Sequence, residues 1–189
     1  MTQITKKAID ASLKKLLMKK PFDKITINDI AEDCGISRMT FYYHFRDIYD
    51  LVEWSCEEDA RRLTSGENGY GYGSWKEGLL ALFNEIYENR AFLANVYHST
   101  GKDTVETYLY KILYNLMLNV VEQQADGRAL SAKDKEFIAG FYRYAFAGVI
   151  TDWIKDGMKE DPAVLVDKTE KIVQGNLAAA LDRFSAGEN

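Results

Sequence analysis

The stretch Phe22–Phe45, FDKITINDIAEDCGISRMTFYYHF, decides how the first part of this 189-residue chain is expected to fold. Thr26 begins a variant of the capping box, with Asp in place of the usual Glu or Gln three residues later, so a helix is expected over about 27–33. Gly35 can adopt the left-handed conformation that ends a helix. Ser37 then caps a second, very short helix. Two short helices joined by a tight turn form a helix-turn-helix pattern.

A helix capped by Ser37 can enter the major groove of DNA with its N-terminal turn leading. Arg38 can then form a bidentate pair with guanine, and Thr40 can contact a thymine methyl group or a phosphate. Hydroxyl and imidazole groups at the end of this helix can bond phosphate oxygens, whereas Phe41 and Phe45 are expected in the core. The predicted DNA-binding residues are Lys24, Thr26, Ser37, Arg38, Met39, Thr40, Tyr42, Tyr43, His44 and Arg46.

The net charge of −5 argues mildly against a nucleic-acid partner, but the charge is unevenly distributed. Residues 1–50 carry nine Lys or Arg and seven Asp or Glu, a net charge of +2, and the remainder carries −7. The basic end of the chain is therefore also the end with the helix-turn-helix pattern. We expect DNA affinity to depend on two such heads acting together and to fall steeply with salt.

An all-α fold of about nine helices is expected, since the chain has only two prolines and its apolar residues recur at helical spacing. We predict a helix-turn-helix DNA-binding domain over 1–50, in which three helices form the head, and a helical regulatory, ligand-binding and dimerisation domain over 51–189. The Gly-rich tract 66–74 is expected to be a mobile connection. Helices are predicted over about 5–20, 27–33, 37–43, 47–64, 75–88, 91–98, 103–124, 133–158 and 163–185.

The sequence also argues against several other classes of protein. No run of about 20 apolar residues is present and the start lacks a signal peptide, so we expect a cytoplasmic protein without a membrane partner. Two cysteines far apart and two histidines argue against a metal site. No cofactor loop and no paired nucleophile and base are visible, so we expect neither a cofactor nor an enzyme.

The residues from Phe22 to Phe45 closely resemble the DNA-binding signature of TetR-family transcriptional regulators, and the resemblance covers about 5–55. The run 141–154, FYRYAFAGVITDWI, followed by Gly157 and Met158, looks like the branch containing dihydroxyacetone-kinase-operon regulators. The family resemblance implies a homodimer with one reading head per subunit on double-stranded operator DNA. It also implies DNA contacts by six of the residues named above, Thr26, Arg38, Thr40, Tyr42, Tyr43 and His44. Ile48 departs from the Lys that family members often carry there, so either Arg46 takes over that phosphate contact or affinity for the DNA backbone is lower.

For the acidic remainder, the resemblance places any effector pocket within the fifth to eighth helices. A lining is predicted from Phe83, Tyr87, Tyr97, Tyr108, Met117 and Phe141, although any one of these aromatic residues is more readily explained as core. Small residues in 133–158 and an apolar stripe in 163–185 predict a dimer surface on the last two helices, alongside packing within the chain. Neither charge nor spacing identifies the effector, which could be a small molecule or a protein.

We therefore expect a DNA-binding transcriptional regulator, a repressor released by an effector bound in the C-terminal domain. The alternative is a DNA-binding activator whose C-terminal domain docks a partner protein. An exposed apolar patch without an apolar cavity would favour the alternative.

Overall fold

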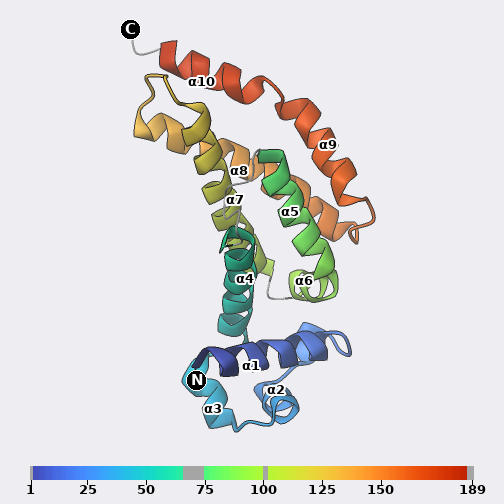
Figure 1. Ribbon diagram of the computed structural model, residues 1–189. Helices are drawn as coiled ribbons and strands as arrows, with labels where there is room; N and C mark the ends of the chain where they lie inside the picture. Colours follow the sequence, from blue (N-terminus) through green and yellow to red (C-terminus); the bar gives the residue numbers. More distant parts are fainter. Residues whose placement is uncertain (1, 66–74, 100–101, 187–189) are drawn as a thin grey trace. The chain divides into compact units, whose positions relative to one another are not determined.

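The computed structural model describes residues 2–65, 75–99 and 102–186, and within these ranges the chain is helical without strands (Figure 1). The all-α prediction is confirmed, and each predicted helix is present. The Gly-rich tract 66–74 lies outside the described residues. The elements are α1 (Thr2–Leu17), the 3₁₀ turn η1 (Phe22–Lys24), α2 (Ile27–Cys34), α3 (Arg38–His44), α4 (Ile48–Ser65), α5 (Trp75–Glu88), α6 (Arg90–Tyr97), α7 (Lys102–Gln124), α8 (Ala132–Lys155), α9 (Pro162–Val173) and α10 (Asn176–Ala186).

The first helix, expected over about 5–20, runs from Thr2 to Leu17. Two further differences lie in the second half of the chain, and a glycine explains each. The helix expected over 163–185 is divided into α9 and α10 at Gly175, whose φ of +77° ends a helix at little cost for glycine. The helix expected to reach 158 ends at Lys155, because Gly157 also has φ of +77° and the N–H of Met158 bonds back to the carbonyl of Trp153 (2.8 Å). This bond closes the last turn of α8.

The chain divides into two compact units. Unit 1 comprises Met1–Arg61 and Asn89–Tyr108, and unit 2 comprises Arg62–Glu88 and Leu109–Asn189. Helices α4 and α7 therefore contribute residues to both units. This division reflects which residues pack together. The boundary between a DNA-binding domain that ends at residue 50 and a regulatory domain that begins at residue 51 stays a prediction.

In unit 1, α1, α2 and α3 enclose the core of the head. Ile9 and Leu13 of α1, Ile30 of α2 and Phe41 of α3 are fully buried, and Phe45 directly after α3 packs its ring 5.8 Å from that of Phe41. The expectation that both phenylalanines are core residues is confirmed. Their burial holds α3 against the other two helices of the head.

Helix α6 belongs to unit 1 as well. The amide of Asn95 donates a hydrogen bond to the carbonyl of Leu17, the last residue of α1 (2.8 Å). Lys14 Nζ lies 5.4 Å from the centre of the buried Phe92 ring. Because the last carbonyls of a helix lack partners within it, Asn95 caps α1 from another element.

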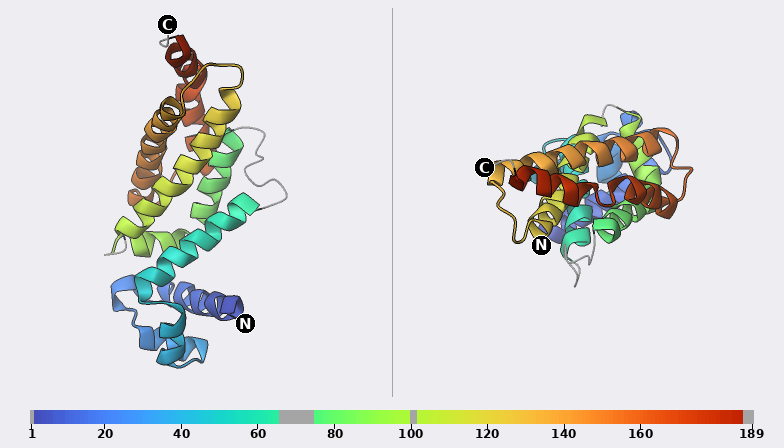
Figure 2. Two further views of the ribbon diagram at one scale, coloured as in Figure 1. Left: turned by 90° about the vertical axis from the view of Figure 1, so that its left-hand side faces the viewer. Right: turned by 90° about the horizontal axis from the view of Figure 1, so that it is seen from above.

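Unit 2 is a bundle in which α5, α8 and α9 pack with the second part of α7 (Figure 2). Trp75 of α5 stacks on Phe146 of α8, with ring centres 5.9 Å apart. Lys76 bridges α5 to α9 by pairing with Asp167 (2.8 Å) and with Glu170. The hydrogen bonds to Asp167 and then Glu170 raise the pKa of Lys76 to about 12. None of the helices in the described ranges is long and apolar enough to span a membrane.

Candidate nucleic-acid interface

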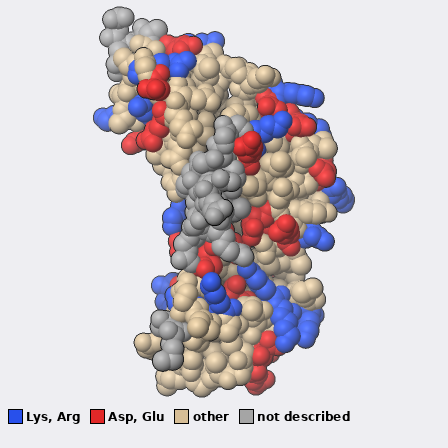
Figure 3. Space-filling model, in the orientation of Figure 1, with Lys and Arg blue, Asp and Glu red and all other residues tan. Residues whose placement is uncertain are grey.

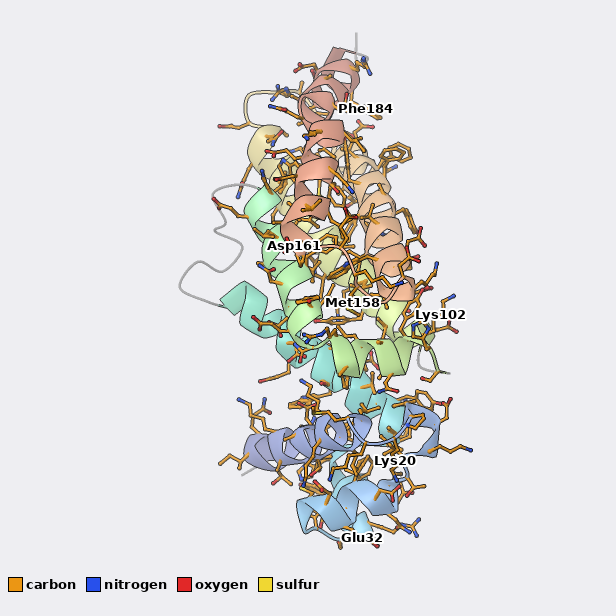
Figure 4. All side chains as sticks on the ribbon, turned by 90° about the vertical axis from the view of Figure 1, so that its right-hand side faces the viewer. Lys20, Glu32, Lys102, Met158, Asp161 and Phe184 are labelled. Carbon is orange, nitrogen blue, oxygen red and sulfur yellow. The ribbon has the colours of Figure 1, made fainter. Side chains whose placement is uncertain are left out.

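The N-terminus of α2 is fixed by reciprocal hydrogen bonds. The N–H of Asp29 donates to Thr26 Oγ1 (3.2 Å), and the N–H of Thr26 donates to Asp29 Oδ2 (2.7 Å). Lys20 Nζ lies 2.8 Å from the same carboxylate oxygen (Figure 4). The hydrogen bond from Lys20, followed by those from Thr26, lowers the pKa of Asp29 from 3.8 to about 2. The predicted capping box is present, and Lys20 strengthens it.

The turn between α2 and α3 has the conformation expected from Gly35. This residue has φ of +70° and ψ of +31°, in the left-handed region, and its N–H bonds to the carbonyl of Glu32 (3.2 Å). The N–H of Ile36 bonds to the carbonyl of Ala31 (2.9 Å). These bonds end α2 and set the direction in which the chain enters α3.

Ser37 caps α3, as predicted. Its Oγ accepts a hydrogen bond from the N–H of Thr40 (3.1 Å) and lies 2.9 Å from Thr40 Oγ1. The two hydroxyl groups therefore hold one another at the start of α3. The N–H groups of this first turn that the cap does not use remain suited to a phosphate, since a helix N-terminus favours negative charge.

Helix α3 has one buried face and one exposed face. Phe41 is fully buried, whereas the side chains of Met39 and Tyr43 are 79% and 77% exposed. Arg38 and Tyr42 are exposed too. An exposed Met and two exposed Tyr on a seven-residue helix leave apolar and hydroxyl-bearing groups in contact with solvent, which is unusual unless another molecule covers them.

The residues after α3 continue this exposed surface. His44 is half-buried and packs its ring 5.0 Å from that of Tyr43. Arg46 is exposed, and its Nε lies 3.4 Å from Asp47, a weak surface pair that leaves most of its donors available. Ile48, which departs from the family pattern, is the first residue of α4 and offers no charge.

All ten predicted DNA-binding residues lie in unit 1 between the end of α1 and the start of α4. Eight of the ten are exposed and two are half-buried. Lys24 and Thr26 both precede α2, six of the others lie on α3, Ser37 directly precedes α3, and Arg46 lies two residues before α4. The structure gives their positions in the free chain, so their contacts with DNA stay predictions.

Sequence reasoning missed Lys20 as part of this surface. In Figure 3, basic side chains gather on unit 1 around the end of α1, where Lys19 and Lys20 lie. Lys15, on the last turns of α1, pairs with Asp33 of α2 (2.6 Å), and this hydrogen bond lowers the pKa of Asp33. The run of lysines was visible in the sequence, but only the fold brings Lys20 to Asp29 in the first turn of α2 and Lys15 to Asp33 in its last turn.

The six residues predicted to line a ligand pocket are divided between the two units. Tyr97 and Tyr108 belong to unit 1 and the other four to unit 2. Tyr97 is buried and its hydroxyl donates to Glu106 (2.8 Å). Phe83 and Tyr87 both pack against Trp153, at ring-centre distances of 5.1 and 6.1 Å.

The remaining two pocket residues have opposite surroundings. Met117 is fully buried in unit 2. Phe141 is one of the most exposed aromatic residues of the described chain. Within unit 2 the structure thus brings Phe83 and Tyr87 together around Trp153 and leaves Phe141 on an outer surface.

Comparisons with known proteins agree with this geometry. Residues 9–53 match the model for bacterial regulatory proteins of the tetR family, and residues 73–175 match the model for a transcriptional regulator C-terminal region. A curated relative, the HTH-type dhaKLM operon transcriptional activator DhaS of Lactococcus lactis, is 32% identical over 94 residues, which are 50% of this chain and 49% of DhaS. The match thus spans about half the length of this relative.

Solved structures share the fold. The dihydroxyacetone kinase operon activator DhaS has a TM-score of 0.74 at 24% identity, with 96% of this chain and 98% of that chain covered. The fatty acid degradation regulator FadR of Bacillus halodurans has a TM-score of 0.62 at 17% identity, with 92% and 96% covered. Together with the two family matches, which place the helix-turn-helix at the N-terminus and the regulatory helices after it, these findings show that the chain belongs to the TetR family of transcriptional regulators.

Proposed function

We propose that this chain is a DNA-binding transcriptional regulator whose α3 reads the major groove. The observation that carries the proposal is the two-sided character of α3, with Phe41 fully buried and Met39 and Tyr43 largely exposed. Arg38 and Met39, in the first turn, are the residues that would reach base edges, Arg38 by pairing with guanine. The methyl group of Thr40 would contact thymine, because its hydroxyl is already bonded to Ser37. TetR-family regulators are DNA-binding proteins without enzymatic activity.

In this proposal, side chains on both sides of α3 hold the DNA backbone. Thr26 and Lys24 would contact phosphates at the start of α2, and Arg46 would do so beyond α3. Lys20 would add positive charge next to Thr26, because it lies on the carboxylate that caps α2. The hydroxyl groups of Tyr42 and Tyr43 and the imidazole of His44 complete the set.

We propose that the regulator binds its operator as a homodimer formed through the last two predicted helices. These comprise α8, α9 and α10, which expose Phe137 and Tyr144 on α8 and Ile172 on α9. A two-fold dimer would place two copies of α3 about 34–36 Å apart, or a multiple, to read successive major grooves. We place this activity in the cytoplasm, where the regulator has access to chromosomal DNA.

An effector site in the C-terminal domain is the second part of the proposal. Phe83, Tyr87 and Met117 are the strongest candidates within unit 2, the first two because they share contacts with Trp153. Tyr97 and Tyr108 belong to unit 1, and Phe141 of unit 2 is exposed, so these three residues are weaker candidates. An effector that changed the spacing of the two α3 helices would change DNA affinity.

Such a protein can either repress or activate transcription. A repressor released by its effector is the first candidate. The second is an activator whose C-terminal domain docks a partner protein, and it is favoured by the name of the DhaS relative, a transcriptional activator. A promoter-reporter assay with and without the chain separates the two, since a repressor lowers transcription from the operator-bearing promoter and an activator raises it.

Selection of duplexes from a randomised DNA library tests DNA binding directly. The purified full chain should enrich a two-fold symmetric duplex with half-sites one helical turn, or a multiple, apart. The matched control is the double variant Arg38→Ala, Tyr43→Ala, which removes two exposed side chains and should enrich no such sequence. Failure of the wild-type chain to enrich any duplex would overturn the proposal.

A further inference from the structure

The outer face of α8 carries an exposed aromatic stripe. Phe137, Phe141 and Tyr144 are 65%, 64% and 59% exposed. They follow one another at spacings of four and three residues and therefore lie on one face of the helix. Contiguous apolar surface of this kind marks a site where another molecule binds.

The same stripe continues along α8 with small residues. Ala145 and Gly148 are exposed, and a Cβ atom built on Gly148 would meet nothing within 4 Å. The φ of Gly148 is not positive, so its backbone conformation does not require glycine either. Because glycine weakens a helix interior relative to alanine, the fold of a single chain gives no reason for it here. The first half of the stripe thus carries large aromatic side chains, and the second half carries only small residues.

We propose that α8 of a second copy of this chain lies antiparallel across this stripe, with the two-fold axis between Tyr144 and Ala145. Phe141 and Gly148 are equally far from this axis, so Phe141 of each copy packs over Gly148 of the partner subunit. Tyr144 packs against Ala145 of the partner subunit in the same way. This inference rests on the proposed homodimer and names the register of its central helix pair.

The charges at the two ends of α8 favour the antiparallel arrangement. In this register Lys133 comes near Asp152 and Asp156 of the partner subunit, and Lys155 comes near Asp134 of the partner subunit. Within one chain Lys155 Nζ already lies 2.9 Å from Asp152, and Asp134 accepts a hydrogen bond from Ser131 (2.6 Å). The Lys155 pair is exposed and can exchange partners. A parallel pair would instead bring Lys133 to Lys133 and Phe141 to Phe141.

The neighbouring helix extends this surface. The ring of Phe184 on α10 lies 6.1 Å from that of Phe137 (Figure 4). The proposed contact is therefore continuous with α10, which belongs to the second of the two helices predicted to form the dimer. Phe137 and Phe184 together would border the contact at the start of α8.

A size-exchange experiment tests the register. Phe141→Ala removes the ring that is proposed to pack over Gly148 of the partner subunit. Gly148→Phe fills the space that this ring would occupy. Each should raise the dimer dissociation constant by about 100-fold, since the contact occurs twice and the loss of one packed aromatic is worth about tenfold or more. The double variant Phe141→Ala, Gly148→Phe exchanges bulk and space and should return the constant to near the wild-type value. Sedimentation equilibrium of the full chain measures all three.

The matched control is Glu136→Phe, which places a phenylalanine at an exposed position of α8 outside the stripe. It should leave the dissociation constant unchanged. Circular dichroism and thermal unfolding of each variant show whether the fold is kept, and the exposed positions of the stripe predict that it is. Single variants without effect, or a double variant as weak as the single ones, would overturn the register.

Disulfide cross-linking gives an independent test. In a Cys34→Ser background, Ala145→Cys should form a disulfide-linked dimer on mild oxidation, since residue 145 lies next to the axis. Lys155→Cys should not, because the two copies of residue 155 would lie about 30 Å apart at 1.5 Å per residue. Equal cross-linking by both variants would overturn the register.

Operator binding separates this inference from the proposed function. A wild-type dimer that binds its selected operator but fails both register tests would leave the DNA-binding regulator intact and overturn only the α8 pairing. A wild-type chain that is monomeric at the operator-binding concentration would overturn the homodimer and the pairing together.

Discussion

Replacing Arg38 with Ala should abolish most sequence-specific DNA binding while leaving the fold unchanged. Arg38 is the first residue of α3, it is exposed, and it forms no ion pair among the described residues. Substitutions at such surface positions change stability by about 0.5 kcal/mol or less. The variant should therefore unfold at the wild-type temperature.

The loss of affinity can be worked out from the symmetry of the complex. One bidentate pair between Arg and guanine contributes about 1–3 kcal/mol of discrimination, and a dimer has two heads, so the expected loss is about 2–6 kcal/mol. This corresponds to a factor of about 30 to 3 × 10⁴ in the dissociation constant for the selected operator. Binding to random DNA should change much less, because the phosphate contacts are kept.

Fluorescence anisotropy with a labelled operator and a labelled random duplex measures both constants at one salt concentration. Arg38→Lys is the matched control, and it should recover only part of the loss, since Lys keeps the charge without the planar pair of donors. An operator affinity within threefold of wild type for Arg38→Ala would refute base reading by Arg38. An equal loss on both duplexes would instead assign Arg38 to the DNA backbone.

Three further outcomes follow from the head. Phe41→Ala should destabilise it by about 3–5 kcal/mol, because the ring is fully buried against Phe45, and a shifted chemical unfolding midpoint would show this; an unchanged midpoint would contradict the packing. Lys24→Ala should reduce the slope of log affinity against log salt by about 2 for a dimer, one phosphate contact per head, whereas an unchanged slope would remove Lys24 from the interface. The depressed pKa of Asp29, about 2 against an ordinary 3.8, means that its ionised form stabilises the head above pH 4 and that this contribution disappears as the pH falls toward 2. The melting temperatures of wild type and Asp29→Asn should therefore differ at pH 7 and converge between pH 4 and pH 2, and a constant difference would contradict this role.

Local signals account for the accuracy of the helix predictions. The capping oxygens of Thr26 and Ser37 and the left-handed Gly35 act within a few residues, so their effect could be read directly from the sequence, and all three have the predicted geometry. Gly175 is a counterexample. It interrupts an apolar stripe that continues through 163–185, so periodicity alone predicted one helix where the structure has α9 and α10.

The candidate site was predictable to the extent that it lies on one short segment. Nine of the ten predicted DNA-binding residues fall in the range 24–44, where spacing along the chain places them just before α2, at the cap of α3 and on α3. The role of Lys20 was not predictable, because its bond to Asp29 depends on how α1 packs against α2. Which of the predicted pocket residues lie together was not predictable either, since positions far apart in the sequence meet only through packing.

By itself, the sequence determined most of the helices, the caps at Thr26 and Ser37, the helix-turn-helix and the split of charge between a basic head and an acidic remainder. These depend on interactions within a few residues or on composition, which folding does not alter. Only the tertiary structure decided which side chains remain at the surface. The exposure of Phe137, Phe141 and Tyr144 beside an unfilled Gly148 depends on where the neighbouring helices pack against α8. Helical spacing of aromatic residues looks the same in the sequence whether their side chains are buried or exposed. The packing of the other helices determines whether each side chain is buried in the core or exposed to solvent.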